Sequence, residues 1–186
     1  MNELLDLLET RQSYRGLFDP ARKIPNDDLE KILEAARWTP SAHNMQNFEI
    51  VVVDDKKLLS AISEIKRPVN LTFIKENYSQ LSFSEDELRQ KKVGILGAQF
   101  PKSWQTPDPN PEEVGNEDRN LFMSKQIMSC SNLMFLLYDP GNRAPASEND
   151  FLGVISFGCA MENMWLMANS LGIAVHIISS LSEKSV

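Results

Sequence analysis

Two arginines and a serine recur at every second position in residues 11–15, which read Arg11-Gln12-Ser13-Tyr14-Arg15. We call these residues the arginine segment. In an extended chain the two arginines and the serine point the same way, whereas a helix would separate the serine from them. Two guanidinium groups with a hydroxyl between them form a clamp for a phosphate dianion. Gly16 follows directly and favours the extended form. A solvated basic patch is the alternative explanation.

A second polar stretch lies between a helical pattern and an apolar strand pattern, and reads Pro40-Ser41-Ala42-His43-Asn44-Met45-Gln46-Asn47. We call residues 40–47 the polar loop. Its amides and hydroxyls match the donors and acceptors of an uncharged heterocycle without adding charge. An ordinary helix C-cap and turn, in which Asn and Ser bond to the backbone, explains the stretch equally well. His43 suits a packing or surface role better than that of a general base.

The overall charge argues against a nucleic-acid partner. The chain has 186 residues with 19 basic and 26 acidic side chains, a formal net charge of −7, whereas nucleic-acid binders concentrate positive charge. Cys130 and Cys159 lie in apolar stretches and are expected in the core of a protein from a reducing compartment. Two distant histidines predict no metal site. The N-terminus lacks a secretory pattern, so we expect a cytoplasmic location without a membrane partner.

The alternation of helix and strand patterns predicts an α+β fold. Helices are expected from Leu4 to before Gly16, from a cap at Asn26 or Asp27 to Pro40, and over 56–66, 84–96, 118–131 and 151–171. Strands are expected at FEIVVVDD, as a continuously buried run, at LMFLLYD and at IAVHIISS. Polar residues inside the 151–171 helix predict a buried central helix rather than a membrane span.

The stretch 97–118 has a different composition, with four prolines, two glycines and two large aromatic residues, Phe100 and Trp104. This composition predicts neither helix nor strand, and the two aromatic residues have too few apolar neighbours in the stretch to form a core. The stretch is therefore either a surface loop or a lid, because large aromatic side chains are costly to expose unless they cover something.

The chain resembles the nitroreductase family of FMN-dependent oxidoreductases in three features, which occur in the family's order and spacing. They are Arg11-x-Ser13-x-Arg15, then Pro40-Ser41-x-x-Asn44-x-Gln46 before an apolar strand, and the 151–171 helix with Glu162-Asn163 inside it and Leu171-Gly172-Ile173 closing it. Gln46-Asn47-Phe48 stands where the family commonly has Gln-Pro-Trp. The resemblance implies one domain over residues 1–186, with a helical and loop excursion at about 67–118. Its expected fold is an α/β sandwich with a central, mostly antiparallel sheet flanked by helices.

The same resemblance implies a homodimer with two FMN sites at the subunit interface. The arginine segment would hold the phosphate of the chain's own FMN, and the polar loop would contact the flavin of the partner. Backbone groups after the last strand would approach flavin N5 or O4, and Lys125 or Gln126 would face the pyrimidine ring. The expected contacts are Arg11, Gln12, Ser13, Arg15, Pro40, Ser41, Ala42, Asn44, Gln46, Gln126, Ser179 and Ser180.

The reaction implied by the resemblance is hydride transfer from NADH or NADPH to flavin N5, followed by reduction of a nitroaromatic compound, a quinone or a similar small acceptor in a ping-pong cycle. The flavin carries this chemistry, so no catalytic side chain is expected. Phe100 and Trp104 would line the acceptor pocket, with one of them over the flavin face. Dehalogenation or enone reduction on the same fold, and a flavin-binding protein without turnover, are the alternatives.

Overall fold

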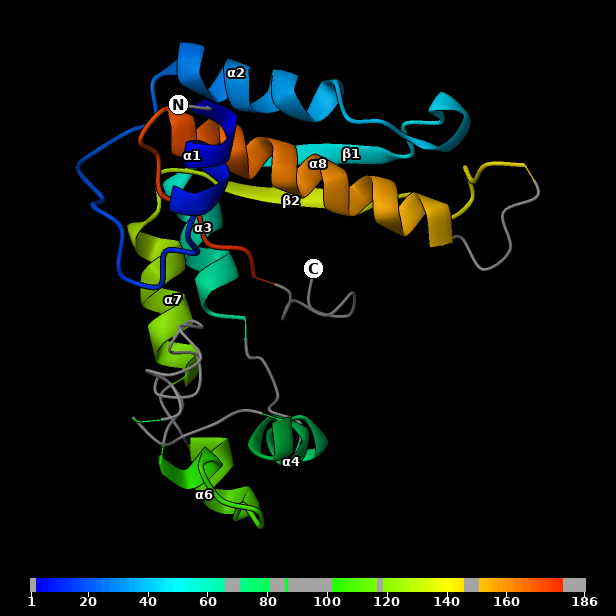
Figure 1. Ribbon diagram of the computed structural model, residues 1–186. Helices are drawn as coiled ribbons and strands as arrows, with labels where there is room; N and C mark the ends of the chain where they lie inside the picture. The colour runs from blue at the N-terminus through cyan, green and yellow to red at the C-terminus, as the bar shows by residue number, and fades with distance from the viewer. Residues whose placement is uncertain are drawn as a thin grey trace. The chain divides into compact units, whose positions relative to one another are not determined.

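The structure is a computed structural model that describes residues 3–65, 71–80, 86, 102–116, 119–145 and 151–178 (Figure 1). The chain divides into two compact units. The first comprises Met1–Ile62 and Gln126–Ser179, and the second comprises Ser63–Lys125 and Ser180–Val186. The expected excursion at residues 67–118 therefore falls within the second unit.

The first unit contains both polar stretches. Its elements are α1 (Glu3–Thr10), α2 (Asn26–Arg37), the 3₁₀ helix η1 (Ala42–Asn44), β1 (Phe48–Val53), most of α3 (Lys56–Ser63), the end of α7 (Arg119–Ser129), β2 (Leu133–Tyr138) and α8 (Phe151–Ser170). These helices and strands confirm the predicted ones to within a few residues at their ends. Apart from Asp86, the helix predicted over 84–96 lies outside the described residues.

The start of α2 differs from the prediction. Pro25 occupies the N-cap position with an extended backbone, and no side chain caps the helix, so the cap predicted at Asn26 or Asp27 is wrong. Asp27 and Asp28 lie instead inside the first turn. There their negative charges complement the positive end of the helix dipole, which gives the same residue types a different role.

β1 and β2 form a two-stranded antiparallel sheet in which Phe48 lies opposite Tyr138 and Val53 opposite Leu133. On the second face of the sheet, Val51 is 43% exposed and Leu137 is 44% exposed. The prediction of a continuously buried strand over 48–53 is therefore wrong. Side chains alternate along a strand, and the face that carries Val51 is left largely open.

α2 and α8 lie side by side over the covered face of this sheet (Figure 1). The buried residues of α8 form a stripe of mostly small side chains: Gly153, Ser156, Ala160, Met164 and Ala168. Small side chains let the two helix backbones approach closely. Ile32 and Ala36 of α2 complete this core with Met164 and Ala168, so α8 is fixed against both α2 and the strands.

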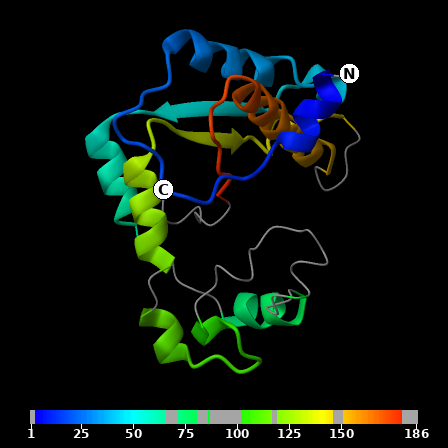
Figure 2. The ribbon, with the colours of Figure 1, turned by 60° about the vertical axis from the view of Figure 1, so that its left-hand side comes forward.

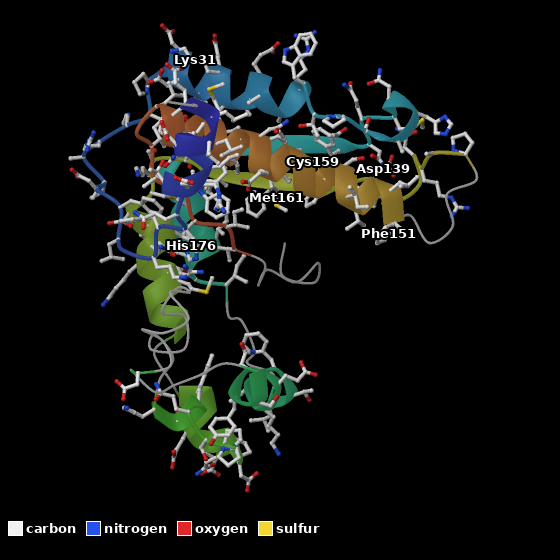
Figure 3. The ribbon with its side chains drawn as sticks, in the orientation of Figure 1. Lys31, Asp139, Phe151, Cys159, Met161 and His176 are labelled. Atoms are coloured by element: carbon white, nitrogen blue, oxygen red, sulfur yellow. The ribbon has the colours of Figure 1, made fainter. Side chains whose placement is uncertain are left out.

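The N-terminal half of α8 is less covered. Four large apolar residues there are between 46% and 68% exposed: Phe151, Leu152, Val154 and Ile155. By length and composition α8 is apolar enough to cross a membrane, although 28% of the tested window is already buried inside the protein. The prediction of a buried central helix therefore holds for the small-residue stripe and not for this half of the helix. Figure 3 shows Phe151 at the end of α8 remote from His176.

α8 ends at a glycine, as predicted. Gly172 has φ 71°, a backbone conformation that glycine adopts without strain. Its N–H donates to the Asn169 carbonyl at 3.0 Å, and the Ile173 N–H donates to the Ala168 carbonyl at 2.8 Å. These two bonds form a Schellman motif, which satisfies the last carbonyls of the helix and directs the chain back along the first unit.

Residues 173–178, which were expected to form a strand, are extended without a strand ladder. One backbone bond, from Tyr14 N–H to the Val175 carbonyl at 2.8 Å, joins them to the arginine segment (Figure 2). The strand prediction is wrong for these residues because a ladder needs a neighbour along its length, and the neighbouring chain bends at Gly16. The rest of the predicted strand lies outside the described residues.

A second cluster in the first unit joins α3, α7 and the strands. Its buried members are Leu59, Ile127 and Cys130, and Phe18, Val53, Ile62 and Leu133 pack around them. Burial raises the pKa of the Cys130 thiol, which therefore stays neutral and acts as a small apolar side chain. Cys159 is half-buried, and both cysteines are free, as the sequence predicted.

The second unit has a small core of its own. Its described elements include α4 (Leu71–Gln80), the 3₁₀ helix η3 (Lys102–Trp104) and α6 (Pro111–Asn116). Trp104 is 1% exposed and packs with Ile74, and its ring meets that of Phe73 edge-on at 6.5 Å. The prediction that 97–118 has no helix and no core is wrong. Pro111 begins α6 at a position where a helix needs no N–H donor, and Trp104 finds its apolar neighbours on α4.

Candidate cofactor site

The arginine segment begins where α1 ends, and the structure assigns it to neither helix nor strand. Arg11, Ser13 and Arg15 are half-buried, whereas Gln12 and Tyr14 are exposed. An extended chain produces this alternation. Both guanidinium groups and the hydroxyl therefore share one side, as predicted, while Gln12, the fourth predicted contact of this segment, lies on the other.

Arg11 is held against α8 by two side chains. Its Nε lies 3.1 Å from Oε1 of Glu162, and its guanidinium carbon lies 4.0 Å from the ring centroid of Trp165. Glu162 and Trp165 are three residues apart and so share a face of the helix. The two charged side chains are 28% and 41% exposed, and such pairs stabilise a fold by at most about 1 kcal/mol. The main consequence is that the cation has a defined orientation.

A tight turn follows the arginine segment. The Tyr14 hydroxyl donates to the Leu17 carbonyl at 2.8 Å, and its ring lies 5.2 Å from that of Phe18. A Cβ atom at Gly16 would stand 2.6 Å from the Tyr14 hydroxyl oxygen. A larger residue at Gly16 would therefore displace the exposed end of the Tyr14 ring from the turn.

The side-chain amide of Gln126, which is 1% exposed, has protein partners at both ends. Nε2 donates to the Gly16 carbonyl at 2.9 Å, and Oε1 lies 2.7 Å from Nδ1 of His176. Because a carbonyl can only accept, the bond to Gly16 fixes which end of the amide is nitrogen, and Nδ1 of His176 must carry the proton. Contact between Gln126 and a flavin remains a prediction, and the amide already ties the turn after the arginine segment to residues 173–178.

His176 is a neutral ring next to a cation. Burial, followed by the positive charge of Arg15, lowers the pKa of His176 below its ordinary value of 6.5. The ring is therefore uncharged at pH 7, and the positive charge on this side of the first unit belongs to the arginines. Figure 3 shows His176 beside the end of α7, where Gln126 lies.

The polar loop has an unusual backbone. His43, Asn44 and Gln46 have φ values of 51°, 54° and 44°, in the left-handed region that costs residues other than glycine about 1–2 kcal/mol each. Ser41 holds this conformation, since its carbonyl accepts from the Asn44 N–H and its Oγ accepts from the Gln46 N–H, both at 2.9 Å. Strained backbone of this kind clusters at functional sites.

The loop presents its polar side chains to solvent in this single chain. Asn44 and Gln46 are exposed, as are Pro40 and His43. By contrast Asn47 is 5% exposed, and its carbonyl accepts from the Asp139 N–H at 3.1 Å. The loop is thus anchored at its end next to β1. The Gln46 amide bonds back to the end of α2, where Nε2 donates to the Arg37 carbonyl at 3.4 Å, and the Asn44 side chain is exposed. The half-buried Ser41 and Ala42 lie at its base.

The two predicted contact regions lie apart within one chain. α1 and the arginine segment lie near the start of α2, and η1 with the polar loop lies beyond its other end (Figure 1). α8 contacts both α1 and η1. The structure therefore brings the arginine segment together with Glu162, Trp165 and His176, and it does not bring the polar loop to the same place.

A cavity of about 180 Å³ opens beside the arginine segment. It is lined by Gln12, Tyr14, Trp165, Asn169, Gly172, Ile173, Ala174 and Val175. Two aromatic rings, two amides and a stretch of backbone line it, and it is smaller than the roughly 300–1,000 Å³ typical of small-ligand sites. Trp165 thus contacts the Arg11 guanidinium and also forms part of the cavity wall.

Other predicted site residues are not placed here. Phe100, Ser179 and Ser180 lie outside the described residues. Trp104 lies in the core of the second unit, and its place in an acceptor pocket remains a prediction. Across the described ranges, no group of three His, Cys, Asp or Glu side chains could hold a metal ion.

The sequence did not indicate which side chains lie next to Arg11 and Arg15. Glu162 was noted as part of a pattern but given no partner, and Trp165 and His176 were not singled out. One signal was present, because Glu162 is the charged residue of this helix and Trp165 lies at helical spacing from it. His176 gave no such signal, since a single histidine in an apolar run is consistent with simple burial.

Comparison with known proteins identifies one family. The family model described as "Nitroreductase family" matches residues 8–186. Among curated proteins, a provisionally named NADH dehydrogenase/NAD(P)H nitroreductase from Archaeoglobus fulgidus is 44% identical over 64 residues. That match covers 34% of this chain and 36% of the relative, so it reaches little more than a third of that protein's length.

Two solved structures share the fold. A nitroreductase family protein from Clostridium novyi NT has a TM-score of 0.60 at 16% identity, covering 98% of this chain and 73% of that one. A nitroreductase with bound FMN from Bacteroides fragilis has a TM-score of 0.50 at 23% identity, covering 94% of this chain and 68% of that one. At these identities the comparison establishes the fold and no further property.

Proposed function

Because the chain belongs to the nitroreductase family, we propose that it is an FMN-dependent oxidoreductase that uses NADH or NADPH to reduce a small acceptor such as a nitroaromatic compound or a quinone. The observation that carries this proposal is the half-buried row of Arg11, Ser13 and Arg15 in a protein of formal net charge −7. Each charge-assisted hydrogen bond to a phosphate is worth about 1.5–3 kcal/mol. The bound FMN of the Bacteroides fragilis relative supports this choice of ligand.

The residues present fit an FMN phosphate. Two guanidinium groups and a hydroxyl on one side of an extended segment supply charge and donors. The Glu162 carboxylate beside Arg11 offsets part of this charge, and the neutral His176 beside Arg15 adds none. When bound, FMN supplies the redox chemistry of a ping-pong cycle, so the chain contributes no catalytic side chain. The chain's own task is to hold the cofactor and exclude water, with the backbone of Ser179 and Ser180 proposed to lie at the flavin edge.

The polar loop requires a second chain in this proposal. The loop lies at the end of α2 away from the arginine segment (Figure 1), and its Asn44 and Gln46 side chains are exposed, so we propose that they contact the flavin of a partner subunit. The exposed apolar residues of α8 supply a surface for such a partner, since monomers rarely expose large contiguous apolar patches. Phe151, which is 68% exposed, would be buried by the second chain.

Flavin binding is tested with the purified protein and two arginine variants. Flavin content and fluorescence quenching measure FMN affinity in wild type, Arg11→Ala and the control Arg22→Ala, whose arginine is exposed. Loss of one charge-assisted bond predicts a drop in affinity of about tenfold or more for Arg11→Ala. Full flavin occupancy of Arg11→Ala after extensive dialysis would contradict the phosphate clamp.

Turnover is tested separately from binding. Oxidation of NADH and of NADPH by the FMN-loaded protein is followed with a nitroaromatic compound, a quinone and an enone as acceptors. Activity with at least one acceptor supports an enzyme, and the ratio of kcat/KM values identifies the acceptor class. A protein that binds FMN but reduces none of the three would instead be a flavin-binding protein without this activity.

The shared site is tested by oligomeric state. Light scattering alongside flavin absorbance should give a dimer that releases FMN when it is diluted below its dissociation constant. Phe151→Asp should weaken the dimer and lower flavin content together, because it places a charge in the proposed contact. A monomer that retains one tightly bound FMN would rule out the shared site while leaving the phosphate clamp intact.

A further inference from the structure

We propose that Glu162 and Asn163, neighbours on α8, position both cofactor segments: Glu162 orients Arg11 toward the phosphate, and Asn163 fixes the point at which the polar loop begins. This inference rests on the proposed function. Adjacent residues of a helix project about 100° apart, so one dipeptide can reach two different segments. α8 itself is held rigidly by its packing against α2 and the strands.

Glu162 defines which edge of the Arg11 guanidinium is available. Its Oε1 forms an ion pair with Nε at 3.1 Å, so the carboxylate lies on the Nε side of the guanidinium, although the buried Nε–H makes no hydrogen bond to any described residue. The two terminal nitrogens, Nη1 and Nη2, form the opposite edge, which can grip a phosphate with two parallel bonds. Trp165 supports the flat face of the same group at 4.0 Å. Within the described part of the chain, Glu162 is the carboxylate that pairs with Arg11.

The benefit of this arrangement is preorganisation. The pair is too exposed to stabilise the fold much, as its 28% and 41% exposures indicate. A free arginine, however, loses rotamer freedom when it closes on an anion, and that loss weakens affinity by about two- to tenfold. An Arg11 side chain that Glu162 and Trp165 already hold has little rotamer freedom left to lose. FMN should therefore bind about two- to tenfold more tightly than it would to a free arginine.

Asn163 acts on the other segment. Its Nδ2 donates to Thr39 Oγ1 at 3.0 Å and lies 3.4 Å from the Ala35 carbonyl. Thr39 is 3% exposed and directly precedes Pro40, where the polar loop starts. The amide therefore bonds the end of α2 to α8 and fixes the position at which the strained loop leaves α2.

The two halves of the proposal are separable with riboflavin, which has the same ring system as FMN without the phosphate. Glu162→Ala should lower FMN affinity by about two- to tenfold and leave riboflavin affinity unchanged, because only the phosphate contact loses its preorganisation. Glu162→Gln should also lower FMN affinity selectively, since it removes the negative charge of the ion pair and Nε donates no hydrogen bond to a described residue that an amide oxygen could keep. Asn163→Ala should lower the affinities for FMN and riboflavin by the same factor, because the loop contacts the ring.

Control variants and outcomes complete the test. Glu34→Ala removes a glutamate that pairs with Arg37 at 3.4 Å and should alter neither affinity. If Asn163→Ala does not fold, Asn163→Leu, which has a similar size and neither donates nor accepts a hydrogen bond, replaces it. Equal losses of FMN and riboflavin in Glu162→Ala, or no loss of either, would overturn the role of Glu162. An unchanged riboflavin affinity in both Asn163 variants would overturn that of Asn163. A wild-type protein that binds neither flavin overturns the proposed function itself, and this inference with it.

Discussion

Replacement of Gln126 by methionine removes the two hydrogen bonds that join the turn after the arginine segment to residues 173–178. Methionine is unbranched and fills nearly the same space, but it bonds to neither the Gly16 carbonyl nor the His176 imidazole. Both partners are half-buried in the folded protein. A buried group left without its bond costs about 1–3 kcal/mol, and half burial places each loss near the lower end. Gln126→Met should therefore destabilise the protein by about 2–3 kcal/mol.

Urea unfolding, followed by circular dichroism and tryptophan fluorescence, measures this loss. With a denaturant slope of about 2 kcal/mol/M, the midpoint should fall by about 1–1.5 M. Lys125→Met is the matched control, because it introduces the same side chain at the exposed neighbouring position and should change stability by less than about 0.5 kcal/mol. In the double variant with His176→Phe the losses should fail to add by about 1 kcal/mol, since both substitutions remove one shared bond.

Two results would refute this reasoning. Equal midpoints for Gln126→Met and Lys125→Met would show that the buried amide contributes nothing beyond its volume. Strict additivity with His176→Phe would show that the histidine is not its partner. A Gln126→Met protein as stable as wild type but with weakened FMN binding would instead support a contact between Gln126 and the flavin pyrimidine ring.

Three further predictions concern the rest of the chain. Burial and then the charge of Arg15 lower the pKa of His176 below 6.5. The stability due to the neutral ring is therefore complete above pH 6.5 and is lost as the pH falls through the lowered pKa of the folded state. His176→Phe should flatten that part of the curve of unfolding free energy against pH. Leu59→Ala, at a side chain that is 0% exposed, should cost about 2–5 kcal/mol in urea unfolding, whereas Leu58→Ala, at 55% exposure, should cost less than about 0.5 kcal/mol. Trp104→Ala should make the second unit far more sensitive to limited proteolysis, because loss of a buried tryptophan costs about 3–5 kcal/mol, and an unchanged cleavage rate would contradict its role in that core.

Local patterns in the sequence predicted much of the first unit. The apolar spacing of α2, the β-branched run of β1 and the glycine after α8 each depend on neighbours within a few residues, so their positions are visible without the fold. The alternation of Arg11, Ser13 and Arg15 was also local, and the structure places these three side chains on one side. Physical rules of short range therefore predicted the elements and the arginine side of the candidate site.

Long-range contacts account for what the sequence did not show. Gln126 bonds to Gly16 across 110 residues, and no pattern around either residue indicates the other. Trp104 lies in a proline-rich stretch, yet its core partner Ile74 comes from a helix that the sequence did not predict. The predicted third strand failed for residues 173–178 for the same reason, because pairing depends on where another segment bends. Fold-level contacts decided these cases.

The backbone of the polar loop leads to a final prediction, since Gln46 and Met45 are neighbours with opposite conformations. Gln46 has φ 44°, whereas Met45 has φ −68°. At Gln46 a Cβ atom costs about 1–2 kcal/mol that glycine avoids, and glycine's greater freedom in the unfolded chain costs only about 0.5–1 kcal/mol. Gln46→Gly should therefore be more stable than Gln46→Ala by up to about 1.5 kcal/mol.

At Met45 the order should reverse, with Met45→Ala more stable than Met45→Gly by about 0.5–1 kcal/mol, because a right-handed conformation gives glycine no advantage. The comparison cancels the lost side chains, so the sign of each difference reports the backbone alone. Both Gln46 variants lack the amide and should lose FMN affinity equally if that amide meets a flavin. The same stability order at both positions would show that the loop is not strained. Its conformation would then need no functional explanation, and the argument that links the loop to a cofactor would rest on its side chains only.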